Sequence, residues 1–235
     1  THPKWLLVLT PLCFVIGSFI VEKYAPAAGG TGIPQVVTAM RLDPLQQQTQ
    51  IHELLRLRVF FVVMVSSLLV VLGGGTLGRE GPMVHMGACL FYFVGHLFQR
   101  YFGYAEHRSW IVAGAAAGIS AAFNAPLAGI VFVLEELSQA HLHVFKSVII
   151  TAAIIGGVVS QWLSGRYLFL GFPNLGSVPL SSLPWALGLG VLCGLLAYPF
   201  HRLLRDDVRS FFSKYIKTRL GIALVSGLLV ALLSI

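Results

Sequence analysis

The chain has 235 residues, of which 56% are hydrophobic and only 11% are charged, with a mean hydropathy of +0.81 and a net charge of +7. Soluble domains carry about 25% charged residues, so this composition excludes an ordinary soluble domain and indicates a protein embedded in lipid. Long unbroken apolar runs favour membrane helices over the alternating strands of a barrel.

In chain order, long apolar segments at residues 5–21, 57–72, 145–163 and 183–200 predict membrane helices, and residues 220–235 begin another. A short helix is expected from Pro34, and a further helix at residues 83–98. Two half-length apolar segments, 110–123 and 127–137, are separated by Asn124-Ala125-Pro126. Full-length helices that alternate with broken ones are typical of transporters whose helix ends meet near the membrane midplane.

Small residues in these segments predict where helices pack closely. Gly114 and Gly118, and likewise Gly190 and Gly194, are separated by three residues. This spacing lets the backbones of two membrane helices approach each other.

The excess of basic residues does not indicate a nucleic-acid partner, because about half of them flank apolar segments. One cluster consists of Arg202, Arg205, Arg209, Lys214, Lys217 and Arg219. The positive-inside rule places this cluster in the cytoplasm and the loop at residues 165–183 outside. We therefore expect an integral, multi-pass protein of the cell (inner) membrane, with the lipid bilayer as its surroundings.

The sharpest functional motif is Gly78-Arg79-Glu80-Gly81-Pro82, at the start of an apolar helix. A charged side chain near the bilayer centre costs about 3 kcal/mol, so Glu80 is by default a functional residue. A helix that begins around Pro82 points its unpaired N–H groups at this motif and favours an anion there. An ionised Glu80 competes with a mobile anion for this site, and it leaves the site when it is protonated. Proton binding and anion binding are thereby linked. The alternative is a helix-start acid paired with Arg79.

A second glycine-rich loop, Gly29-Gly30-Thr31-Gly32-Ile33-Pro34, also opens a helix. Its amides and the Thr31 hydroxyl can replace part of the water shell of an anion, although a plain interhelical turn is the alternative. Neither loop matches a nucleotide-binding motif.

Other classes of function find little support in the sequence. His141 and His143 have no nearby Cys or carboxylate set to complete a metal site, and the three cysteines show no CxxC spacing. An intramembrane enzyme would need a metal site or a serine with a partner base, and no HExxH motif is present. We expect neither an enzyme nor a cofactor. A structural scaffold would leave both glycine-rich loops unexplained.

Three segments together resemble the CLC family of chloride channels and transporters: GTGIP at residues 30–34, GREGP at 78–82 and GAAAGISAAFNAPLAGIVFVLEE at 114–136. The resemblance implies an all-α membrane fold with broken helices, comprising one inverted-repeat half and the start of the second. The GxFxP loop of the family's second half is not present, and the chain begins at Thr1, not Met. Residues 1–235 are thus expected to be one incomplete transmembrane domain of a protein that forms homodimers at full length.

The resemblance also implies roles for individual residues. It places the gate and proton acceptor at Glu80 and an inner anion site at Thr31, Gly32 and Ile33, and we expect Arg79 and Gly81 to contact the anion as well. Members that exchange anions for protons usually carry a second glutamate at the position of Glu136, where channels commonly have an apolar residue. A chloride/proton antiporter is therefore predicted, and a passive, voltage-gated type of chloride channel is the alternative.

Two further positions bear on this prediction. Thr31 replaces the usual serine of the family but keeps a hydroxyl, which favours chloride over nitrate or fluoride. His85 stands where the family often has glutamine, and we expect it to be a packing residue more than one that tunes Glu80.

Overall fold

The computed structural model describes residues 5–43, 45–98, 107–136, 146–165, 180–203 and 218–233. Every regular element in these ranges is helical, so the predicted fold class is confirmed. The α-helices are α1 (Leu6–Tyr24), α2 (Ile33–Arg41), α3 (Gln48–Leu55), α4 (Leu57–Leu72), α5 (Glu80–Leu97), α7 (His107–Phe123), α8 (Pro126–Glu136), α9 (Lys146–Ser164), α10 (Leu183–Arg202) and α12 (Arg219–Leu233). Two 3-10 turns are η1 (Pro26–Ala28) and η4 (Leu180–Ser182).

Four segments in the described ranges are long and apolar enough to cross a membrane. They are Leu6–Tyr24, Gln48–Leu72, Ser147–Ser164 and Leu180–Arg202. These match the four long segments expected from the sequence, with one difference. The second span also includes α3, which precedes the segment expected at residues 57–72, and it is interrupted by the extended backbone of Arg56 (φ −67°, ψ 156°).

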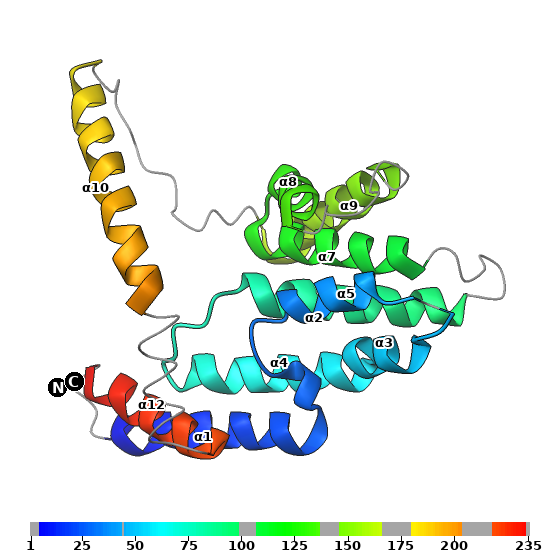
Figure 1. The fold of residues 1–235 in the computed structure, drawn as a ribbon, viewed down its shortest axis with the longest axis horizontal. Helices are drawn as coiled ribbons and strands as arrows, with labels where there is room; N and C mark the ends of the chain where they lie inside the picture. The colour runs from blue at the N-terminus through cyan, green and yellow to red at the C-terminus, as the bar shows by residue number, and fades with distance from the viewer. Residues whose placement is uncertain are drawn as a thin grey trace.

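The helices form a row in which each packs against the next (Figure 1). In this row α12 packs on α1, α1 on α4, α4 on α5, α5 on α7 and α7 on α9. The half-length α8 folds back against both α7 and α9. As predicted, the break between α7 and α8 lies at residues 124–125, where Asn124 has a positive φ of 55°.

Helices α5 and α7 approach closely at glycines. A Cβ atom at Gly87 would overlap the Gly114 carbonyl oxygen, and one at Gly118 would overlap the Met83 carbonyl oxygen. The close packing predicted for Gly114 and Gly118 is therefore confirmed. This close packing holds the first half of α5, which begins with the last three residues of the GREGP motif, against α7.

Helix α10 stands apart from this row in Figure 1, and all its residues are exposed. Gly190 and Gly194 have no atom of another described residue within 4 Å of their Cβ positions. The close packing predicted for this second glycine pair is therefore not found in the described residues.

Candidate functional site

The first glycine-rich loop leads into α2 through a backbone conformation that requires glycine. Gly32, the residue before the helix, has φ +91°, and Gly30 has φ +99°. Side chains with a Cβ atom rarely adopt this region, so the sequence Gly-Thr-Gly follows from the turn itself. No side chain caps the start of α2, and its first-turn N–H groups face the loop.

Gln35 closes this loop from inside α2. Its side-chain amide donates a hydrogen bond to the Gly29 carbonyl oxygen. No role for Gln35 could be assigned from the sequence, because nothing in a linear motif shows that its side chain turns back on the loop.

Helix α5 begins at Glu80, three residues earlier than predicted. Pro82 lies within its first turn, where a proline is tolerated because its missing N–H has no partner in the helix. Glu80 is therefore the first helical residue, at the positive end of the helix dipole, and no side chain caps this end. The Glu80 side chain is exposed and is not part of the apolar core.

The two glycine-rich loops, separated by some fifty residues in the sequence, are in direct contact. A Cβ atom at Gly81 would overlap the Thr31 carbonyl oxygen, and one at Gly32 would lie 2.7 Å from the Gly81 carbonyl oxygen and 2.8 Å from the His85 Cβ. Only glycine permits this approach at either position. The starts of α2 and α5, with their positive dipole ends, are thus held side by side.

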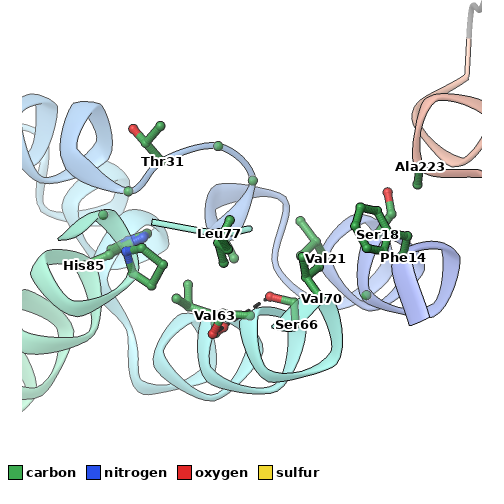
Figure 2. Close-up of a pocket in the computed structure, with 18 of the residues that line it drawn as sticks. Phe14, Ser18, Val21, Thr31, Val63, Ser66, Val70, Leu77, His85 and Ala223 are labelled. Carbon is green, nitrogen blue, oxygen red and sulfur yellow. Dashed lines mark hydrogen bonds between the residues drawn. The ribbon is translucent and has the colours of Figure 1, made fainter. Parts of the chain in front are cut away.

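Both loops line a single cavity of about 960 Å³. Figure 2 shows Thr31 and His85 at one end, Phe14 and Ala223 at the other, and Leu77 between them. The predicted anion-binding residues that line it are Thr31, Gly32, Ile33, Glu80 and Gly81. The structure therefore brings most of the predicted site residues to one cavity.

Among the described residues, the charged ones that line the cavity are Glu22, Glu80 and Arg219. Arg219, the first residue of α12, lies beside the first loop, with its Nη1 3.6 Å from the Cβ position of Gly29. The guanidinium and the two uncapped helix starts each favour a bound anion in this cavity, which also contains the two carboxylates. The sequence placed Arg219 only among residues that set topology, because its nearness to Gly29 depends on how α12 packs on α1.

The other predicted residues lie elsewhere. Arg79 precedes α5 and is not among the residues that line the cavity, so a role in anion binding stays a prediction. Glu136 is the last residue of α8, and its side chain falls outside the described part of the structure. His141 and His143 also lie outside the described residues. Within the ranges described, no group of three or more His, Cys, Asp or Glu side chains is arranged to hold a metal ion.

The contact between the loops predicts that alanine substitutions at two glycines of the GREGP motif will change the stability of the protein by very different amounts. Gly81→Ala should destabilise the folded protein by about 3 kcal/mol, because its methyl group collides with the backbone of Thr31. Gly78→Ala should change stability by less than about 0.5 kcal/mol, since nothing lies within 4 Å of its Cβ position. Thermal unfolding of both variants of the full-length protein in detergent measures this. Equal effects would contradict the observed contact.

Comparison with known proteins identifies the family of this chain. The family described as voltage gated chloride channel matches residues 13–235. An H(+)/Cl(-) exchange transporter ClcA of Cronobacter sakazakii is 34% identical over 211 residues, 86% of this chain and 43% of the relative. The protein of that name from Salmonella arizonae is 34% identical over 200 residues, 84% of this chain and 40% of the relative.

A solved structure is also similar. The X-ray crystal structure of a slow cyanobacterial Cl-/H+ antiporter matches with a TM-score of 0.77 and 26% identity, over 97% of this chain and 52% of that chain. The chain thus spans about half the length of the relatives it matches. Nearly the whole chain carries the family pattern, and its helices follow the same fold. The chain belongs to the voltage-gated chloride channel, or CLC, family of membrane transport proteins.

Proposed function

We propose that the full-length protein exchanges chloride for protons across a membrane, with the cavity between the two glycine-rich loops as part of the anion pathway. The observation that carries this proposal is the contact of Thr31 and Gly32 with Gly81, which places Glu80 at the edge of the same cavity. Relatives of the chain are named as H(+)/Cl(-) exchange transporters, which supports the same substrates here.

The chemistry of the site suits a partly dehydrated anion. Two helix starts supply backbone N–H groups and positive dipole ends, and Arg219 adds a full positive charge. The Thr31 hydroxyl can donate a further hydrogen bond. These donors replace part of the water shell that the ion loses on entering the cavity, as in other ion pathways.

Glu80 supplies the link to protons. When ionised, its carboxylate competes with chloride for the positive region at the start of α5. When it binds a proton from outside, it loses that attraction and leaves the region to chloride. Each proton taken up by Glu80 then favours the movement of the anion, and this is the coupling that an exchanger requires.

A passive chloride channel is the second candidate, and Glu136 is the residue that disfavours it. Exchange needs a titratable group on the inner side, because one carboxylate cannot collect protons from both faces of the membrane. Glu136, at the end of α8, fits that position in the family pattern. A channel has no need for this second carboxylate.

Surroundings and partners follow from the same proposal. The lipid bilayer of the cell membrane would cover exposed apolar side chains such as Ile155 and Trp162 of α9. A homodimer is expected for the full-length protein. Chloride and protons are transported substrates, and no resident cofactor is part of the mechanism.

Paired flux measurement tests the proposed function. The full-length protein is reconstituted in liposomes, and chloride and proton movements are recorded together under an imposed chloride gradient. An exchanger pumps protons uphill as chloride moves down its gradient. Chloride flux with no coupled proton movement would replace the proposal with the channel candidate.

The cavity also predicts that Thr31 controls anion selectivity. Thr31→Pro removes the hydroxyl and one backbone N–H, so the preference for chloride over nitrate should fall by about tenfold, the effect of one lost hydrogen bond to a charged group. Thr31→Ser keeps both donors and is the matched control. Relative transport of the two anions into liposomes measures the change, and an unchanged ratio in Thr31→Pro would place selectivity elsewhere.

A further inference from the structure

His85 lies at the point where the first glycine-rich loop, α5 and α3 meet. Its side chain is fully buried in the second turn of α5. The Cβ position of Gly32 is 2.8 Å from the His85 Cβ, so the loop rests directly on this residue. On the other side, the His85 Nε2 is 2.9 Å from the carbonyl oxygen of Leu54.

The partner of Nε2 determines what the ring contributes. A carbonyl oxygen only accepts hydrogen bonds, so the ring proton is on Nε2, and the Nε2–H group donates a hydrogen bond to the Leu54 carbonyl oxygen. Leu54 is in the last turn of α3, where backbone carbonyls have no partner within their own helix. The chain then breaks at Arg56 before α4 begins. His85 therefore supplies a donor to the broken end of α3.

The other ring nitrogen marks His85 as more than a packing residue. Nδ1 is buried and has no hydrogen-bond partner among the described residues. A buried nitrogen without a partner is unfavourable, and an apolar side chain would avoid it. The hydrogen bond from Nε2 thus accounts for a polar ring in this place.

We infer that His85 is a positioning residue for the anion site, which fixes the Thr31–Gly32 loop over the start of α5 by fastening α5 to the end of α3. This inference rests on the proposed function and deepens it. Glu80 and Gly81 lie on the same helix, one turn before His85, and the Thr31 carbonyl oxygen contacts Gly81. The loop continues into α2, which packs against both α3 and α5, so a shift of α5 against α3 would move Glu80 relative to the loop.

The test compares three substitutions in the full-length protein. In His85→Gln the terminal amide N–H takes the place of Nε2–H and can still reach Leu54. In His85→Met the donor is lost at similar volume, and in His85→Asn the amide is too short to reach the carbonyl. His96→Gln, at the far end of α5, changes a histidine that lies outside the cavity.

Chloride binding in detergent and the chloride-to-nitrate transport ratio in liposomes are the two readouts. His85→Met and His85→Asn should weaken chloride binding about five- to tenfold and change the ratio by a similar factor. His85→Gln and His96→Gln should match the unmodified protein. The rescue by Gln separates loss of the Leu54 hydrogen bond from a general packing defect.

Several results would overturn the inference. Normal affinity and selectivity in His85→Met would do so, and so would a defect in His85→Gln as large as that in His85→Met. If neither His85→Met nor His85→Asn folds while His85→Gln does, the bond serves folding and not the site. If the unmodified protein binds no chloride, the proposed function itself fails, which is a different outcome from normal binding in every variant.

Discussion

Glu80→Gln in the full-length protein is expected to reduce chloride-driven proton uptake to background and to leave chloride movement insensitive to pH. A neutral amide can neither bind a proton from outside nor compete as an anion for the positive region at the start of α5. Chloride should still pass, because the loop donors are unchanged. Paired chloride and proton flux from the same liposomes measures both effects.

Glu22→Gln is the matched control for this experiment. Glu22 also lines the cavity and loses the same charge, but it belongs to α1 and not to the start of α5. Proton coupling should persist in this variant. Uphill proton movement that survives in Glu80→Gln would remove Glu80 from the coupling mechanism.

Glu136→Gln is expected to stop proton movement while chloride continues to flow, with Glu80 still responding to external pH. A proton from the inner side must cross an apolar region to reach Glu80, and without a titratable group at the end of α8 that transfer has no starting point. The measurement is again paired flux under a chloride gradient.

Glu135 provides the control for Glu136. It is the preceding residue of α8 and is exposed, so Glu135→Gln changes the same type of side chain one position away. We expect this variant to keep its proton coupling. If proton flux stays tied to chloride in Glu136→Gln, this carboxylate is not the inner proton carrier.

A helix start at each glycine-rich loop could be predicted from the sequence, but the contacts that bring the two loops together could not. Each glycine-rich loop indicates a helix start locally, because Gly and Pro are the residues that backbone rules favour at such a turn. The contact between Thr31 and Gly81 depends instead on how α2 packs against α5. No spacing within either motif contains that information. The same reason explains why no role at the site was assigned to Gln35 or Arg219 from the sequence.

Helix α3 was missed for a different reason. Its first residues are polar, so membrane hydropathy alone does not indicate a helix there. Its buried residues, Ile51 and Leu55, are four positions apart and form an amphipathic stripe that was available in the sequence. The hydrogen bond that satisfies the Leu54 carbonyl at the end of α3 could not be predicted, because its donor, His85, comes 31 residues later in the chain.

The most direct test of the account is the position of a bound halide in crystals of the full-length protein. Bromide can replace chloride and is located by its anomalous scattering. We expect a bromide peak in the cavity, within hydrogen-bond distance of the Thr31 hydroxyl and beside the start of α5 at Gly81. A second peak should replace the Glu80 carboxylate in crystals of Glu80→Gln. Bromide bound only outside this cavity, with none between the two loops, would contradict the account.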